Sequence, residues 1–222
     1  MALTTDGVGE RLAIVRERIA AAGGRPDEVR VVAVTKGHGP DVVAAALAAG
    51  LRDVGENYAQ ELVAKAGECD TRCRWHFLGN VQRNKVKALA PVVQLWQAVD
   101  RAAAGREIAR RAPGAAVLVQ VNVSGEPRKH GARADDVAAL VEELTGSGLD
   151  VRGLMAVGPT GDPEDARPGF RHLVQLAERL GLPERSIGMS DDLEIAVAEG
   201  STMVRVGRAL FGPRPGRAEL RR

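Results

Sequence analysis

The sequence predicts an α/β protein whose fold is a single closed (β/α)8 TIM barrel. Strand and helix patterns alternate eight times along the 222 residues. Several of the strands are near-continuous apolar runs, as a parallel sheet covered on both faces requires. The alternative, a doubly wound open sheet, usually has about five or six strands, and no GxGxxG or GxxxxGK[ST] motif follows any strand here. We expect one barrel domain over residues 1–222, with a tail that frays after about residue 213.

The first unit of the alternation is the most clearly marked one. Apolar residues at helical spacing predict a helix over 5–22, which two glycines end. The apolar run at 31–35 predicts the first strand. Pro40 and Asp41 begin a second helix, rich in alanine, which Gly50 ends.

The same unit then repeats to the end of the predicted barrel. Further strands are predicted at 53–56, 75–78, 92–96, 116–123, 151–157, 186–189 and 203–206. The helices between them are predicted at 58–66, 84–89, 101–111, 134–145, 164–180 and 192–199.

Composition and charge exclude several classes of protein. Lys and Arg total 31 against 29 Asp and Glu, so the balance gives no general attraction to nucleic acid or membranes. No signal-peptide pattern and no run of 18 apolar residues is present, so we expect a cytoplasmic protein. The spacing of the histidines and of Cys69 and Cys73 fits no metal site, and we expect both cysteines to be reduced thiols.

Polar residues stand at the predicted carboxyl ends of most strands, where the active sites of such barrels lie. Taken one at a time, each is an ordinary loop residue that caps a helix or solvates the rim. They are Lys36, Glu56, Asn57, His76, Asn122, Ser190 and Arg205, with Gly79, Met155 and Gly207 at the same end.

Lys36 is the least ordinary of these residues, because it directly follows the apolar run VVAVT. A lysine drawn into the mouth of a barrel is partly desolvated, which disfavours its ammonium form. The neutral amine is a nucleophile that can form a Schiff base with an aldehyde of a substrate or of a cofactor. The alternative is a lysine whose amine extends to water.

A phosphate seat is the second candidate feature, in the stretch from Ser186 to Gly212. Ser190, followed by Asp191, Asp192 and Glu194, has the pattern of a helix start with acidic residues in its first turn, which offers a hydroxyl and backbone N–H groups to an anion. Gly207 after the eighth strand lets the backbone approach a ligand closely. The loops after strands seven and eight are where such barrels often bind phosphate.

Six motifs, in order, resemble those of one family, the YggS/PROSC-type pyridoxal-phosphate-binding proteins, also called PLP homeostasis proteins. The resemblance covers about residue 8 to residue 212. Thr35, where serine is common, His130 and the GHGP turn depart from the pattern. The motifs are VAVTKGHGP, VGENYAQEL, WHFLGNVQRNKVK, VQVNVSGEPRKHG, RGLMAVGP and GMSDDLEIAVAEGSTMVRVGRALFG.

The resemblance implies an alanine-racemase-like barrel of PLP fold type III without that enzyme's second domain. It implies pyridoxal 5'-phosphate (PLP) held as an aldimine on Lys36, and Arg205 at the pyridine nitrogen. It also implies Ser190 with the backbone of Gly207 and Arg208 around the phosphate. Asn57 is implied to line the cofactor, by the same resemblance.

The leading hypothesis is a PLP-binding protein with little or no catalysis, which buffers PLP or delivers it to PLP-dependent apoenzymes and so affects amino-acid and keto-acid balance. An arginine at the pyridine nitrogen weakens the electron sink that carbanion chemistry needs. The chain also has a single tyrosine, Tyr58, whereas alanine racemase takes its second base, a tyrosine, from its other domain. We expect a monomer that binds neither nucleic acid nor membranes.

Two enzyme hypotheses stay open beside it. One is a fold type III amino-acid racemase or decarboxylase that uses PLP. The other is an aldolase in which Lys36 attacks a sugar phosphate directly, without a cofactor.

Overall fold

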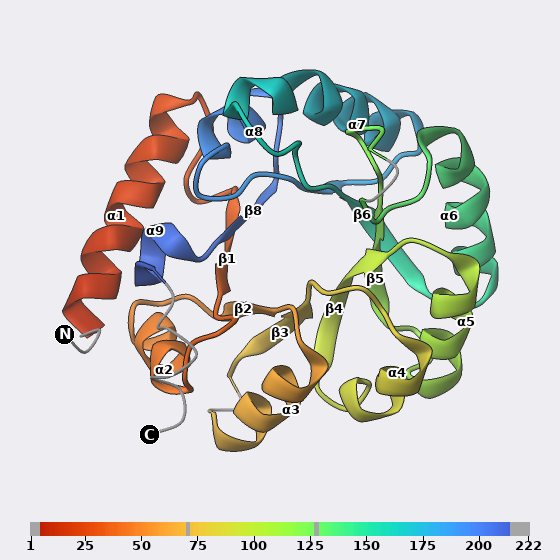
Figure 1. Cartoon of the computed structure of the whole chain (residues 1–222), viewed down its shortest axis with the longest axis horizontal. Coiled ribbons are helices and arrows are strands. Elements are labelled where there is room, and N and C mark those ends of the chain that lie inside the picture. Colours follow the sequence, from red (N-terminus) through yellow and green to blue (C-terminus); the bar gives the residue numbers. More distant parts are fainter. Residues whose placement is uncertain (1–4, 70–71, 127–128, 214–222) are drawn as a thin grey trace.

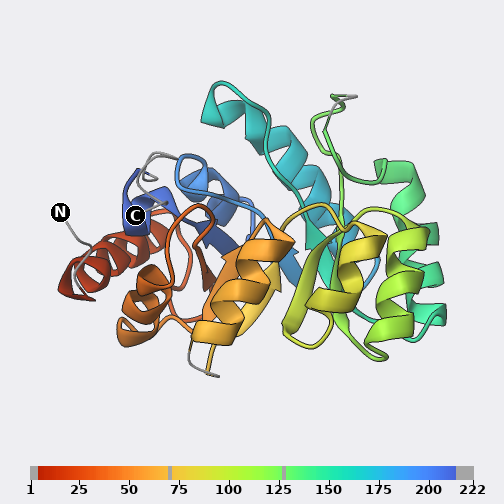
Figure 2. The ribbon, with the colours of Figure 1, turned by 60° about the horizontal axis from the view of Figure 1, so that its bottom comes forward.

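The computed structural model describes residues 5–69, 72–126 and 129–213. Eight parallel strands close into a barrel in which neighbours in sequence are neighbours in the sheet and the last strand pairs with the first. The helices surround the barrel (Figures 1 and 2). The prediction of a (β/α)8 barrel is confirmed. The tail expected to fray lies outside the described residues.

The bounds follow the predicted alternation closely. The strands are β1 (Arg30–Val34), β2 (Asp53–Glu56), β3 (Arg74–Phe77), β4 (Val93–Val99), β5 (Ala116–Gln120), β6 (Asp150–Met155), β7 (Glu184–Ser186) and β8 (Met203–Val206). The helices are α1 (Thr5–Ala21), α2 (Asp41–Ala48), α3 (Ala59–Glu68), α4 (Arg83–Leu89), α5 (Ala102–Arg111), α6 (Val137–Gly146), α7 (Arg167–Arg179), α8 (Leu193–Ala198) and α9 (Arg208–Phe211), with 3-10 turns η1 (Ala134–Asp136) and η2 (Pro163–Ala166).

The seventh strand differs most from its prediction over 186–189. It begins earlier, because the polar residue Glu184 already pairs with Gly153 of β6. It ends at Ser186. Two residues later Gly188 has a φ of +97°, a left-handed conformation that turns the chain out of the strand.

Apolar packing fills both the inside of the barrel and the layer between strands and helices. The inner cluster contains only strand residues: Val32, Leu95, Ala98, Ala116, Leu118, Met155 and Met203. Two larger clusters join strand residues to the helices outside. In one of them Phe77 meets Trp96 edge to face, with ring centroids 5.9 Å apart. The interior of the barrel is therefore a packed core and not a channel.

A chain of buried polar side chains also runs through the barrel. His76 Nε2 lies 3.0 Å from Asp53 Oδ1, and the Gln97 amide donates to His76 Nδ1 at 2.7 Å. Ser186 donates to Gln97 Oε1 at 2.7 Å and accepts from Arg205 at 2.8 Å. The expectation that His76 stands at the mouth with the other polar residues is wrong, because its ring is buried against the start of β2. This series of hydrogen-bonded side chains ends at Arg205 and helps to fix the orientation of its guanidinium.

Replacing Gln97 with leucine is expected to lower the free energy of unfolding by about 1–3 kcal/mol, because His76 and Ser186 each lose a buried hydrogen-bond partner. Chemical denaturation measures the change. The matched control is Gln60→Leu on α3, where the side chain is exposed and the expected change stays within about 0.5 kcal/mol. Equal losses in the two variants would show that the polar chain adds nothing to stability.

Candidate functional site

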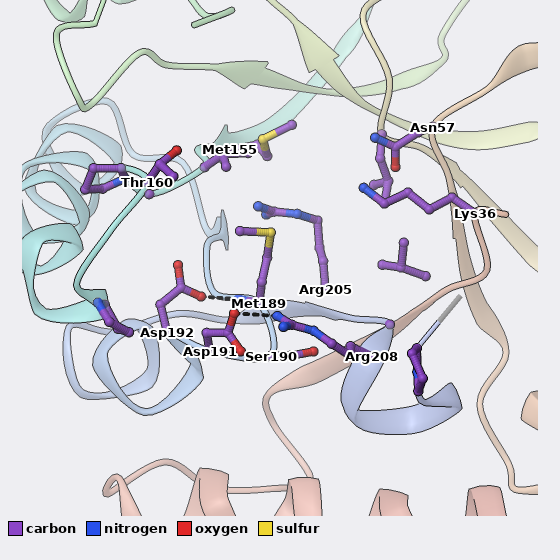
Figure 3. A pocket seen from close by; sticks show the side chains of 18 of the residues that line it. Lys36, Asn57, Met155, Thr160, Met189, Ser190, Asp191, Asp192, Arg205 and Arg208 are labelled. Carbon is purple, nitrogen blue, oxygen red and sulfur yellow. Dashed lines mark hydrogen bonds and ion pairs between the residues drawn. The ribbon is translucent and has the colours of Figure 1, made fainter. Parts of the chain in front are cut away.

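One pocket of about 660 Å³ lies at the carboxyl ends of the strands, and Figure 3 shows its side chains. The segments after β1, β2, β3, β5, β6, β7 and β8 contribute to its wall. The structure brings all six residues expected at the site to this pocket: Lys36, Asn57, Ser190, Arg205, Gly207 and Arg208.

Lys36 reaches the pocket from the end of β1. The residue before it, Thr35, is fully buried, and Gly37 after it has a φ of +71°, so the chain turns as soon as the lysine is placed. The Lys36 side chain extends into the pocket beside Asn57, which follows β2 (Figure 3). A primary amine therefore stands in the pocket wall, half-buried and next to an amide.

Arg205 of β8 is a buried cation at the same pocket. Its Nη1 donates to the Ser186 carbonyl at 2.6 Å and to the Ser186 hydroxyl at 2.8 Å, and its Nη2 donates to the Ala156 carbonyl at 2.7 Å. Burial lowers its pKa to about 10, which leaves it protonated at neutral pH. The pocket thus contains a fixed positive charge that cannot act as a hydrogen-bond acceptor.

The loops after β7 and β8 meet in one corner of the pocket, beside the end of β1, with which β8 pairs. The Ser190 hydroxyl accepts a hydrogen bond from the backbone N–H of Ala209 at 3.2 Å, which ties these two loops together. A Cβ at Gly207 would lie 3.0 Å from the Val34 carbonyl, so glycine lets the end of β8 approach β1. Ser190, Gly207 and Arg208 therefore form one polar corner.

Two carboxylates lie beside this corner, and both have partners. Asp191 forms an ion pair with the Arg208 side chain, although both side chains are more than 60% exposed, so the pair contributes little to stability. Asp192 accepts from the backbone N–H of Met189 at 2.6 Å (Figure 3). The helix start predicted at these residues is confirmed, with α8 beginning at Leu193.

Arg18 of α1 supports the same loop from outside the pocket. Its guanidinium donates to the Ser190 carbonyl at 2.9 Å and to Glu194 at 2.5 and 2.8 Å. The hydrogen bond with Arg18 lowers the pKa of Glu194. Sequence reasoning places Glu194 only in the first turn of a helix, and it misses Arg18 because the two residues are 176 positions apart.

Lys129 is a pocket residue that sequence reasoning does not single out. Its ammonium lies 2.8 Å from Glu126 and donates to the Gly158 carbonyl at 3.1 Å. By contrast, Asn122 does not line the pocket, because its side chain accepts backbone hydrogen bonds within its own loop, from Ser124 and from a glycine. In the sequence, only the KHG motif marks Lys129, and that motif does not indicate where the lysine side chain points.

The combination of groups can hold a small anionic aldehyde. An amine, a guanidinium and a corner of hydroxyl and backbone N–H groups line one cavity. Among the described residues, no group of three or more His, Cys, Asp or Glu side chains is arranged to hold a metal ion. Within the same residues, no helix has the length and apolar character needed to cross a bilayer.

Comparisons with known proteins agree with this geometry. Residues 11–215 match the family described as "Alanine racemase, N-terminal domain". The chain is 40% identical to the pyridoxal phosphate homeostasis protein of Pseudomonas aeruginosa, over 96% of this chain and 97% of that protein. It is 44% identical to the protein of the same name from Deinococcus radiodurans, over 90% of this chain and 97% of that protein.

Solved structures give the same result. PipY of Synechococcus elongatus, in a structure with PLP bound, matches with a TM-score of 0.76 and 32% identity, over 89% of this chain and all of that chain. An alanine racemase from Clostridium difficile matches with a TM-score of 0.73 over 94% of this chain and 58% of that one, and at 15% identity it shows the fold alone. With its barrel, its lysine at the end of β1 and these relatives, the chain belongs to the pyridoxal phosphate homeostasis proteins, a family built on the alanine racemase N-terminal domain.

Proposed function

We propose that this protein binds pyridoxal 5'-phosphate and acts in intracellular PLP homeostasis, with the aldehyde held as a Schiff base on Lys36. The observation that carries the proposal is the meeting of Lys36, Arg205 and the Ser190 corner in one pocket. The names of the relatives and the PLP-bound structure of PipY support it. PLP combines the two groups that such a pocket selects, an aldehyde and a phosphate.

Each residue then has a separate role. The Lys36 amine bonds the aldehyde carbon, and Asn57 packs beside it. The Ser190 hydroxyl and the backbone N–H groups of Gly207 and Arg208 bind the phosphate. Arg205 faces the pyridine nitrogen, where its fixed charge disfavours protonation of the ring.

The pocket favours storage of PLP over turnover. PLP enzymes that make carbanions generally stabilise a protonated pyridine nitrogen, which the guanidinium of Arg205 opposes. Tyr58, the chain's one tyrosine, is 57% exposed and lies outside the residues that line the pocket. No tyrosine is therefore placed to act as the second base of a racemase. The racemase or decarboxylase alternative predicts that a labelled amino acid loses its α-deuterium. It also predicts that Lys36→Ala abolishes this loss.

The proposal extends to partners and location. The protein acts as a monomer in the cytoplasm and releases PLP to PLP-dependent apoenzymes, with no part played by nucleic acid or membranes. Mixing PLP-loaded protein with an apoenzyme tests delivery. Activation faster than the release of free PLP into a trap indicates direct transfer, and activation at the release rate contradicts it.

The first test of the proposal is an absorbance spectrum of the purified protein with PLP added. A visible band of a lysine imine is expected, and borohydride should convert it to a stable adduct that peptide mass mapping assigns to Lys36. A colourless protein that takes up no PLP would overturn the proposal. That result would favour the aldolase hypothesis, in which borohydride traps a sugar phosphate on the same lysine.

A further inference from the structure

Two charged side chains of α3 hold the backbone on both sides of Lys36. On one side, the ammonium of Lys65 donates to the Thr35 carbonyl at 2.8 Å. On the other side, the backbone N–H of Gly37 donates to the Glu61 carboxylate at 2.9 Å. Lys65 and Glu61 lie one turn apart on α3, and the Lys65 ammonium is 3.6 Å from the Glu61 carboxylate. The two peptide groups that flank the reactive lysine are therefore fixed by one helix.

Glu56 completes this group from the end of β2, and it is fully buried. Its carboxylate forms an ion pair with Lys65 and accepts hydrogen bonds from the Thr35 hydroxyl at 2.9 Å and from the backbone N–H of Asn57 at 3.2 Å. Burial raises the pKa of Glu56, and the ammonium of Lys65 opposes that shift. Glu56 thus links Thr35, through its hydroxyl and through Lys65, to the backbone of Asn57.

A purely structural explanation of this group is weak. Lys65 is only 5% exposed, and removing two charges from water costs several kcal/mol that a buried ion pair often only just recovers. Apolar residues of similar size would stabilise the interface between α3 and the barrel at least as well. What they could not provide is hydrogen bonding to the Thr35 carbonyl and the Gly37 N–H, which flank Lys36.

We propose that Lys65, together with Glu56 and Glu61, is a positioning residue for Lys36. The inference rests on the proposed function and deepens it. In the reaction, the neutral Lys36 amine attacks the aldehyde carbon, a C=N bond forms, and the carbonyl oxygen leaves as water with the two amine protons. The attack requires the amine at a defined distance and direction from that carbon, and an error of about 1 Å can cost about a hundredfold. Lys65 and Glu61 remove the freedom that Gly37 would otherwise give this turn.

The experiment compares two ligands that differ only at the reacting group. PLP can form the imine, whereas pyridoxine 5'-phosphate has an alcohol in place of the aldehyde and binds through its ring and phosphate alone. In Lys65→Met, we expect PLP affinity and the rate of appearance of the imine band to fall at least about tenfold. The affinity for pyridoxine 5'-phosphate should stay within about twofold of the wild-type value. Lys87→Met, an exposed lysine on α4, is the control.

Two further variants keep the test decisive if Lys65→Met folds poorly around an unpaired Glu56. The double variant Lys65→Met with Glu56→Gln removes both buried charges and keeps an amide where the carboxylate stood. Glu61→Ala removes the acceptor of the Gly37 N–H at a partly exposed position, and Glu61→Gln restores it. We expect the double variant and Glu61→Ala to lower the affinity for PLP but not the affinity for pyridoxine 5'-phosphate. Glu61→Gln should recover most of the PLP affinity that Glu61→Ala loses.

The outcomes separate this inference from the proposed function. The positioning role is overturned if folded variants lose affinity for PLP and for pyridoxine 5'-phosphate equally. It is also overturned if they lose affinity for neither compound. Wild-type protein that binds neither compound overturns the proposed function, and the inference with it. Selective loss of PLP, with recovery in Glu61→Gln, supports both.

Discussion

Lys36→Ala is expected to lose the visible imine band completely and to bind PLP at least about 100-fold more weakly than the wild type. The covalent bond contributes free energy that ring and phosphate contacts cannot replace, and each factor of ten in affinity corresponds to about 1.4 kcal/mol. The substitution should leave the fold intact, because Lys36 is only half-buried while Thr35 before it carries the buried contacts. Titration followed by absorbance, with dialysis to measure retention, gives both numbers.

The matched control is Lys87→Ala on α4, an exposed lysine away from the pocket, which should retain the band and the affinity. Borohydride treatment adds a second check, because the wild type should keep a phosphopyridoxyl adduct after denaturation and Lys36→Ala should not. An adduct of equal yield on another pocket lysine, such as Lys129, would contradict the assignment of Lys36.

The sequence predicted the barrel and the members of the polar corner because both depend on local patterns. Continuous apolar runs mark strands that are buried on both faces, whatever their partners. Lys36, Ser190 and Gly207 are each adjacent to such a run or to a helix start, so the order of elements alone brings them to one end of the barrel. Their roles rested on a resemblance, since position alone gives no chemistry.

Features that depend on three-dimensional packing could not be predicted in the same way. His76 lies within a strand, where inward and outward directions alternate, and only the tilt and register of the closed barrel decide which it takes. The partners of Glu56 depend on how α3 packs against the end of β1. The short helix α9 spans four residues, too few for a periodic signal.

Gly207→Val is expected to reduce PLP affinity about 10- to 100-fold while changing the affinity for pyridoxal, which lacks the phosphate, by less than about threefold. The backbone at Gly207 has a φ of −114°, so valine is not excluded by conformation. Its Cβ would nevertheless lie 3.0 Å from the Val34 carbonyl, and its methyl groups would occupy the corner beside Ser190. Charge-assisted hydrogen bonds contribute about 1.5–3 kcal/mol each, and losing one of them accounts for the expected change.

Comparing PLP with pyridoxal distinguishes the contribution of the phosphate seat to binding from the contribution of Lys36. Both react with Lys36, so a variant that damages the amine should weaken both alike, whereas a variant that blocks the seat should remove only the preference for PLP. Gly146→Val provides the control, because that glycine is exposed on α6 and a Cβ added there would meet no atom within 4 Å beyond its chain neighbours and the backbone of its own helix. If Gly207→Val keeps the wild-type preference for PLP over pyridoxal, the phosphate does not bind between Ser190 and the end of β8. The aldehyde on Lys36 would then have to point its phosphate elsewhere, and Lys129 would be the next residue to change, since it is the other lysine in the pocket wall.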